Sequence, residues 1–268
     1  MFATLLPALL TGLATTIGAL PFLVVPTVPR KVYDGLLGLG AGLMLAAATL
    51  GLLSTALHDV RAGGVVDGGQ LVLVLGGFAA GVALLSALDQ LVPHEHAGGH
   101  HVHVHEDHVH ERPAHDHAAR KKGLLVVGVM TLHRLPEGLA IGAAYAAGGD
   151  ALAPMLVAAV AVQNAVEGGV MAAPLRRGGL RPGALLALVT ATGMTVPLAA
   201  IVGYTFAAHV AGGLPPMLAL AAGALIYVTC NEVIPESHSH GNEVRATFGV
   251  LAGFVLIMLI QVLFGHAD

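Results

Sequence analysis

The sequence predicts an all-α integral membrane protein with eight transmembrane helices. Apolar residues make up 56% of the 268 positions and charged residues only 10%, whereas a soluble domain carries about 25% charged residues. The apolar residues gather into stretches of about 20, the length that a helix needs to cross a bilayer. The single Cys230 excludes an internal disulfide and any metal site built from several thiolates.

Each expected span is bounded by a break in the apolar pattern. The first ends before Pro26 and Pro29, and because no Lys or Arg precedes Arg30, it is typical of a retained helix rather than a signal peptide. The eight expected spans run from Thr4 to Val25, Tyr33 to Leu57, Gln70 to Leu91, Gly123 to Ala147, Leu152 to Ala173, Gly183 to His209, Leu214 to Glu236 and Val244 to Phe264.

An abrupt change in composition between Pro93 and Arg120 marks a loop that no membrane span could hold. Ten of the sixteen histidines lie there: His94, His96, His100, His101, His103, His105, His108, His110, His115 and His117. We expect a disordered segment that binds Zn²⁺ or a similar ion weakly, and an incidental soluble tether is the alternative. The loop at 93–120 thus separates helices one to three (1–92) from helices four to eight (121–268) within one membrane domain.

Basic residues are concentrated in alternate loops, which predicts the orientation of the chain. One side collects Arg30, Lys31, Arg112, Arg120, Lys121, Lys122, Arg176, Arg177, Arg181 and Arg245, and the other collects Arg61. Cytoplasmic loops carry the excess of Lys and Arg. We therefore expect a multi-pass protein of the cell (inner) membrane with both termini outside and the His-rich loop in the cytoplasm.

The fourth span contains the sequence HRLPEG, which puts ionisable side chains at membrane depth. Each such group costs roughly 2.5–3.5 kcal/mol on insertion scales, so it normally faces a cavity or a partner. His133 and Glu137 are four residues apart and therefore share one face of a helix. This pair has the geometry of half a metal site.

The fifth span repeats the pattern in QNAVEG, where Gln163 and Glu167 have the same spacing and Asn164 lies beside them. A lone buried His133 would more often be bonded to a neighbouring helix. Several coordinating groups at matching depth are costly without a ligand, so we expect the two motifs to converge on one metal ion between helices four and five.

Polar residues at the ends of the third and seventh spans are candidates for a transport pathway. The candidates are Asp89, Asn231, Glu232, Glu236, His238 and His240. Glu232 is expected within the membrane, whereas Glu236 and the two histidines approach solvent and could relay an ion from the central site. A polar helix end at the membrane interface is the alternative for these last three residues.

These residues together resemble the ZIP family of divalent metal transporters, over nearly the whole chain. The resemblance rests on MLAAA in the second span, LDQLVPHEH, the His-rich loop, HRLPEG, QNAVEG and AAGALIYVTCNEVIPE. It implies ATP-independent uptake of Zn²⁺, and often Fe²⁺, Mn²⁺ or Cd²⁺, by an elevator-like or alternating-access movement. The metal ligands that it implies are Met44, His133, Glu137, Gln163, Asn164 and Glu167.

Two departures from the family pattern predict a single-metal site. Arg134 stands where the family usually has Asn, and Val196 stands where a Gly-x-x-Glu-Pro pattern would place a carboxylate. One carboxylate is lost and one fixed positive charge is added where a second ion would bind. We expect Arg134 to pair with Glu167 or Glu137, because an unpaired buried arginine is costly; the alternative is that Arg134 extends to an interface.

Other functions agree less well with these residues. A metalloenzyme is disfavoured because HRLPE lacks the HExxH spacing, so no catalytic cofactor is expected and Zn²⁺ or a similar ion is the transported substrate. A membrane-anchored metal sensor or store using the His-rich loop is the main alternative. Export also stays open, because import rests on the resemblance alone. The expected partners are divalent metal ions and the lipid bilayer, without nucleic acid, and a homodimer stays open.

Overall fold

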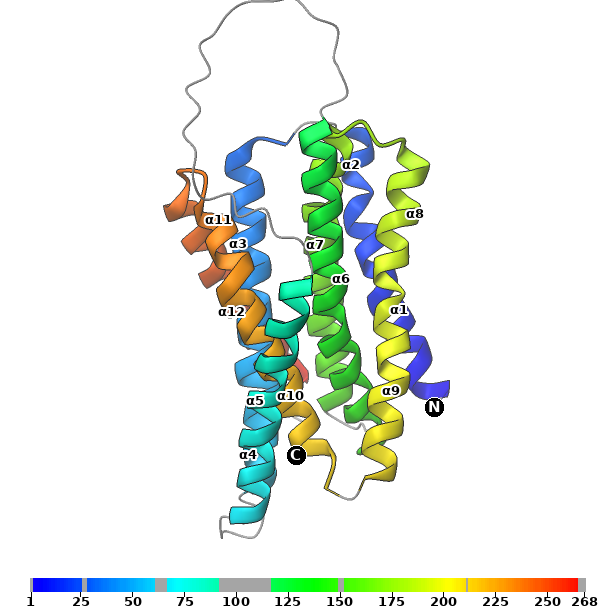
Figure 1. Ribbon diagram of the computed structural model, residues 1–268, viewed down its shortest axis with the longest axis vertical. Helices are drawn as coiled ribbons and strands as arrows, with labels where there is room; N and C mark the ends of the chain where they lie inside the picture. Colours follow the sequence, from blue (N-terminus) through cyan, green and yellow to red (C-terminus); the bar gives the residue numbers. More distant parts are fainter. Residues whose placement is uncertain are drawn as a thin grey trace, which may run out of the picture.

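The computed structural model describes residues 2–25, 28–60, 67–91, 117–148, 152–210 and 212–264, and within these ranges every regular element is helical. Long helices run side by side in a bundle (Figure 1). Seven spans of the described chain are long and apolar enough to cross a membrane. The predicted all-α membrane fold is therefore confirmed.

The helices group into eight consecutive spans in the described residues, several of them broken. The elements are α1 (Phe2–Ala19), α2 (Pro21–Val24), α3 (Arg30–Ala46), η1 (Ala47–Leu53), α4 (Ser54–Val60), α5 (Gly68–Leu91), α6 (His117–Ala146), α7 (Leu152–Arg177), α8 (Pro182–Gly193), α9 (Thr195–His209), α10 (Leu214–Val228), η2 (Thr229–Val233), α11 (Ile234–His238) and α12 (Glu243–Phe264). Helix α6 begins at His117, earlier than the expected Gly123, so it extends into the segment assigned to the His-rich loop.

Helix α6, whose side chains are described only in part before Met130, is also long and mostly apolar, with His133, Arg134 and Glu137 among its apolar residues. Such side chains are tolerated at this depth because neighbouring helices bury them.

Glycines allow the helices of the bundle to approach closely. The most extensive contacts join α6 to α9, α3 to α12, α5 to α10 and α1 to α7. At the α6–α9 contact, a Cβ atom at Gly142 would overlap the carbonyl of Ala200, and one at Gly203 would overlap the carbonyl of Leu139. In lipid, helix association depends on this kind of close backbone packing, so the α6–α9 pair is a tightly packed unit.

Apart from the buried Arg134, the basic side chains at the helix ends gather at one end of the bundle. Arg30 and Lys31 begin α3, Arg176 and Arg177 end α7, and Arg245 lies in the first turn of α12. Figure 1 shows the start of α3, the end of α7, the start of α8 and α11 at its upper end, whereas α1 begins towards the lower end. We call the upper end the basic end of the bundle.

Two spans contain a π-helical segment in their second half. Segment η1 follows directly after α3, and η2 contains Asn231 and Glu232. Pro235 explains the second segment, because a proline ring clashes with the carbonyl four residues earlier in a regular α-helix. Segments of this kind occur frequently at functional sites, and both border the candidate site described next.

Candidate metal centre

Helices α6 and α7 place six polar or charged side chains in the interior of the bundle. Each is at most 3% exposed: His133, Arg134, Glu137, Gln163, Asn164 and Glu167. The spacing of four residues puts His133 and Glu137 one turn apart on one face of α6, and Gln163 and Glu167 one turn apart on one face of α7, and the two helices pack against each other. The two motifs of the sequence are therefore neighbours in space.

Gln163 links the carboxylates of the two helices. Its side-chain nitrogen Nε2 donates hydrogen bonds to Glu137 Oε1 and to Glu167 Oε1, the latter at 3.1 Å. The positive end of the amide dipole thus stands between two acidic groups. A cation that bound both carboxylates would take the place of this amide group.

Arg134 forms an ion pair with the second carboxylate of the site. Its Nη2 lies 3.2 Å from Glu167 Oε2, and its Nη1 donates to the carbonyl of Met130 at 3.4 Å. The sequence predicted that Arg134 would pair with Glu167 or Glu137, and the structure shows the pair with Glu167. A fully buried guanidinium beside Glu167 places a permanent positive charge within the ligand cluster.

His133 lies between this cluster and the seventh span. Its Nε2 is 3.7 Å from Glu232 Oε2 of η2, which is beyond hydrogen-bonding distance. Both ring nitrogens of His133 are buried without a hydrogen-bond partner among the described residues. The imidazole therefore retains its capacity to bind an ion.

Three oxygen atoms of the two motifs are also buried without a hydrogen-bond partner within the part of the chain that the structure describes: Glu137 Oε2, Gln163 Oε1 and Asn164 Oδ1. Nearly all buried polar atoms in proteins have a partner, so each exception needs an explanation. These atoms and the two imidazole nitrogens are ligand types that Zn²⁺ and related divalent ions accept. Their clustering is the strongest physical indication of a metal site.

Met44 reaches the cluster from the opposite helix, α3. It is buried and lines a small cavity that Glu167 and Met130 also line, with Gly40 and Val233 among the other lining residues. The cavity brings a thioether to the same space as a carboxylate. Only tertiary packing could place Met44 there, because it is more than eighty positions from the nearest ligand in the sequence.

The sequence matches the ZIP zinc transporter family over residues 2–261. The chain belongs to this family. It is similar to the zinc transporter ZIPB of Bordetella bronchiseptica, at 38% identity over 94% of this chain and 78% of that protein. It is also 36% identical to the zinc transporter GufA of Myxococcus xanthus, over 99% of this chain and all of GufA.

Family membership establishes a multi-pass membrane protein of a divalent-metal transporter class in which zinc is the principal substrate. A third relative, the zinc transporter ZupT of Corynebacterium glutamicum, is 28% identical over 96% of this chain and 97% of its own length. The relatives carry the names of zinc transporters rather than enzymes.

Two further residues of interest in this ZIP-family chain, Asn164 and Val196, have different surroundings. Asn164 Nδ2 donates to the carbonyl of Thr11 at 3.1 Å, so its amide is held against α1. Val196 is fully buried near the start of α9 within the apolar core. An apolar side chain at this position supplies no ligand to the centre.

No three His, Cys, Asp or Glu side chains among the described residues stand close enough together to hold a metal ion. Donor groups of Gln163 and Arg134 stand beside the carboxylates of Glu137 and Glu167 instead.

A second polar cluster continues from His133 towards the basic end. Asp89 Oδ2 accepts hydrogen bonds from Asn231 Nδ2 at 3.2 Å and from the Tyr227 hydroxyl at 3.3 Å. Asp89 is also hydrogen-bonded to Glu232. Three predicted pathway residues are thus brought together from α5 and η2. Tyr227 was missed because an aromatic residue in an apolar span gives no signal of its own.

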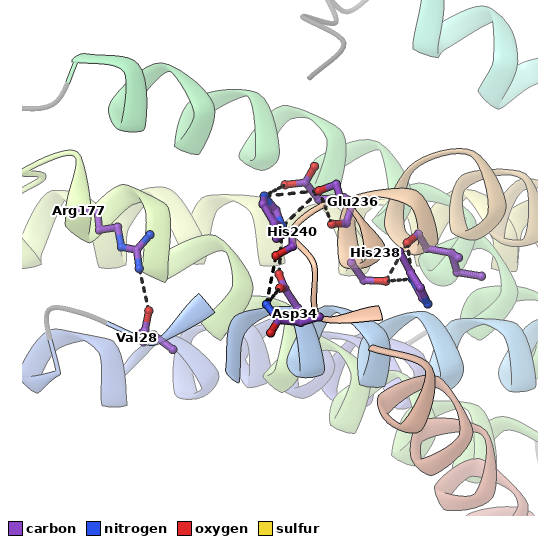
Figure 2. A network of polar contacts seen from close by, with 10 residues as sticks. Val28, Asp34, Arg177, Glu236, His238 and His240 are labelled. Atoms are coloured by element: carbon purple, nitrogen blue, oxygen red, sulfur yellow. Dashed lines mark hydrogen bonds and ion pairs between the residues drawn. The ribbon is translucent and has the colours of Figure 1, made fainter. Parts of the chain in front are cut away.

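The remaining pathway candidates lie at the end of the seventh span, where Figure 2 shows two separate groups. His238 contacts Ser237 and Thr247, whereas His240 lies between Glu236 and Asp34. Asp34 was not among the sequence-predicted residues, although a lone acidic residue at the start of an apolar span could have identified it. The histidines from His94 to His115 lie outside the described residues, as does the side chain of His117.

Proposed function

We propose that the chain is a secondary transporter that carries a divalent transition metal, foremost Zn²⁺ and also Fe²⁺, Mn²⁺ or Cd²⁺, into the cytoplasm through one intramembrane site. The observation that carries this proposal is the group of unpartnered ligand atoms of His133, Glu137 and Gln163, buried on two adjacent helices. Burying such atoms without a bound ion costs free energy, so we expect the site to bind a cation reversibly.

The ion is bound from both ligand helices. His133 and Glu137 supply an imidazole nitrogen and a carboxylate from α6, while Gln163 and Glu167 supply oxygens from α7. Met44 adds a thioether from α3 across the small cavity. Asn164 completes the set if its Oδ1, which has no hydrogen-bond partner in the described chain, turns towards the ion.

The site takes one ion because Arg134 occupies the place of a second. Its guanidinium lies 3.2 Å from Glu167 and cannot lose its charge. Val196 supplies no carboxylate to balance another cation. The two features act in the same direction, since one repels a second ion and the other removes a ligand for it.

The ion leaves through the cluster of Glu232, Asp89 and Asn231. His133 is 1% exposed and the Glu232 side chain 17%, so exposure increases in the direction of the basic end. Glu232 lies within 3.7 Å of the imidazole that would release the ion. Glu236, His238 and His240 are further along the same span, where it reaches the membrane surface.

Alternating access is supported by the pattern of helix contacts. The α6–α9 and α1–α7 pairs belong to one group of closely packed helices, and the α3–α12 and α5–α10 pairs belong to another. The metal ligands of α6 and α7 lie in the first group, whereas Met44 and Glu232 lie in the second. Sliding of one group past the other would carry the ion from one side of the membrane to the other.

The basic end faces the cytoplasm in this proposal, with both termini outside and the His-rich loop inside, following the excess of Lys and Arg at that end. The His-rich loop then gathers ions near the exit as an accessory. The function of a metal sensor or store would require the His-rich loop, whereas transport through the intramembrane site would not.

The test is Zn²⁺ flux into proteoliposomes that contain the full-length protein, Glu137→Ala, or Glu243→Ala as a matched control. Glu137 is buried in the ligand cluster, whereas Glu243 is exposed at the start of α12. We expect saturable flux in the wild type and in Glu243→Ala, and its loss in Glu137→Ala. Flux that persists in Glu137→Ala would show that the central site is wrongly placed.

A second comparison separates transporter from sensor. Deletion of residues 93–116 removes the His-rich loop but leaves α6 intact from its first residue. A transporter retains saturable flux after this deletion. Absence of flux in every form, together with tight zinc binding that the deletion abolishes, would favour the sensor or store.

A further inference from the structure

The turn between α11 and α12 packs a polar cluster against a buried carboxylate of α3 (Figure 2). Asp34 is fully buried, and both of its oxygens accept hydrogen bonds. His240 Nδ1 donates to Asp34 Oδ1 at 3.1 Å, and Asn242 Nδ2 donates to Asp34 Oδ2 at 2.8 Å. These contacts hold the His240 ring in one orientation.

The contact with Asp34 determines which nitrogen of His240 can bind an ion. An ionised carboxylate only accepts hydrogen bonds, so Nδ1 must carry a proton and the unprotonated ring has its lone pair on Nε2. Ser239 Oγ is 3.2 Å from Nδ1 and 3.4 Å from Nε2. Because that hydroxyl donates its hydrogen to the carbonyl of Glu236 at 2.8 Å, it does not occupy the Nε2 lone pair.

The His240 Nε2 atom faces a second carboxylate. Glu236 Oε1 lies 4.0 Å away, on the residue four positions earlier. Zinc bonds to imidazole nitrogen and carboxylate oxygen measure about 2.0–2.2 Å each, so the two atoms would stand about 3.4 Å apart around a tetrahedral ion. Glu236 Oε1 must therefore move slightly closer to His240 Nε2 to share an ion with it. Glu236 is 27% exposed and can rotate to adjust the angle at the ion.

We propose that His240 Nε2 and Glu236 Oε1 form an outer binding site for a divalent transition-metal ion at the basic end, with Asp34 as the positioning residue for His240. The arrangement of carboxylate, imidazole and metal is the one that proteins commonly use, in which the second nitrogen of a ligating histidine donates to a carboxylate. The assignment rests on the proposed transport function and adds Asp34 to the residues that serve it.

The site has two protein ligands and is completed by water. This agrees with the absence of any group of three metal-ligating side chains in the described residues, because Asp34 orients a ligand without being one. The His240 side chain is 15% exposed, which leaves access for water. Because only two of its ligands come from the protein, such a site binds its ion weakly and releases it readily. Both properties are needed of a site at the end of a transport pathway.

His238 is a natural internal control, although it is only two residues away. Its Nε2 lies 3.1 Å from Thr247 Oγ1 of α12, and its Nδ1 contacts Ser237 and the carbonyl of Ile234. Figure 2 shows His238 apart from the group formed by His240, Glu236 and Asp34. Zinc at the outer site should therefore change the reactivity of His240 and leave that of His238 unchanged.

The experiment measures modification of individual histidines in the purified full-length protein. Diethylpyrocarbonate labels accessible imidazoles, and fragment-ion mass spectrometry resolves His238 from His240. Free Zn²⁺ is set with a chelating buffer, so that the His-rich loop cannot deplete it. The variants are Asp34→Asn, Asn242→Ala and Glu236→Gln, with Glu137→Ala to disable the central site.

We expect zinc to protect His240 saturably in the wild type. Asp34→Asn should raise the zinc concentration for half-protection by about 10–100-fold, the usual effect of removing a carboxylate behind a ligating histidine. Glu236→Gln should abolish protection. Asn242→Ala should leave it near the wild-type value, because that variant removes the other hydrogen bond of Asp34. A merely structural role for Asp34 would instead give equal shifts in Asp34→Asn and Asn242→Ala.

The proposal is overturned if His240 is modified equally with and without millimolar zinc, or if the Asp34→Asn and Asn242→Ala variants shift equally. It is also overturned if Glu236→Gln retains full protection, a variant that changes a partly exposed side chain and should fold. Glu137→Ala should keep His240 protection while losing flux. Retained flux in that variant would contradict the central site alone, so the two proposals fail separately.

Discussion

At the scale of single residues, Arg134 is the most informative side chain of the centre. It is fully buried, pairs with Glu167 at 3.2 Å, and makes one long contact with the carbonyl of Met130. Its Nε has no hydrogen-bond partner in the described part of the chain. A guanidinium in this environment depends mainly on one carboxylate, and this dependence can be measured.

Glu167→Gln should destabilise the protein, because it leaves the buried charge of Arg134 unpaired. Removing one partner of a buried ion pair costs about 3–5 kcal/mol, whereas replacing both partners by neutral groups is often tolerated. The double variant Arg134→Met/Glu167→Gln should therefore melt at a higher temperature than Glu167→Gln alone. Thermal unfolding in detergent checks this order, and equal melting temperatures would contradict the importance of the pair.

The number of ions at the centre is a second prediction at this scale. We expect one ion between α6 and α7 in the wild type, since Arg134 supplies positive charge beside Glu167. The variant Arg134→Asn/Val196→Glu removes that charge and adds a carboxylate, so it should hold two adjacent ions. Anomalous diffraction from crystals soaked in Cd²⁺ counts the ions directly, and two adjacent ions in the wild type would refute the single-ion site.

At the scale of helices, close contacts at glycines hold the ligand helix α6 against α9. The carbonyl of Ala200 occupies the space that a side chain at Gly142 would need, whereas Gly128 of the same helix has no atoms within 4 Å of a Cβ position. The two glycines therefore differ in packing while sharing the same low helix propensity.

Gly142→Ala should destabilise the protein, and Gly128→Ala should be neutral or slightly stabilising. Alanine improves helix propensity by roughly 1 kcal/mol at either position, but the added methyl group at Gly142 forces α6 and α9 apart. Melting temperature and Zn²⁺ flux of both variants provide the measurement. Similar behaviour of the pair would mean that this contact does not position the ligand helix.

At the scale of the whole molecule, the orientation in the membrane follows from the distribution of charge. Basic side chains begin α3 and α12 and end α7, and all of these positions lie at one end of the bundle. The opposite end carries the start of α5 at Gly68. The two ends can be labelled separately, because the chain has a single cysteine, Cys230.

In a Cys230→Ser background, Gly68→Cys should react with a membrane-impermeant maleimide on intact cells. Gly183→Cys, near the start of α8, should react only after lysis. A Cβ atom at either glycine has open space around it, so both variants should fold. The reverse labelling pattern would place the basic end outside and contradict transport towards the His-rich loop.

The fold and much of the centre could be predicted from local sequence. Apolar stretches of the right length specify the spans, and a spacing of four residues places His133 with Glu137, and Gln163 with Glu167, on single helix faces. The high cost of buried charge makes such residues conspicuous. These inferences need only the geometry of one helix, so the sequence by itself determined the membrane fold and the two pairs of side chains that each share a helix face.

Only the tertiary structure decided which residues from different helices meet. In the structure, Arg134 pairs with Glu167 and not with Glu137. Met44 lines the cavity beside Glu167, and His240 contacts Asp34. Such contacts depend on how helices rotate and approach one another in three dimensions, which the period of a single helix does not specify.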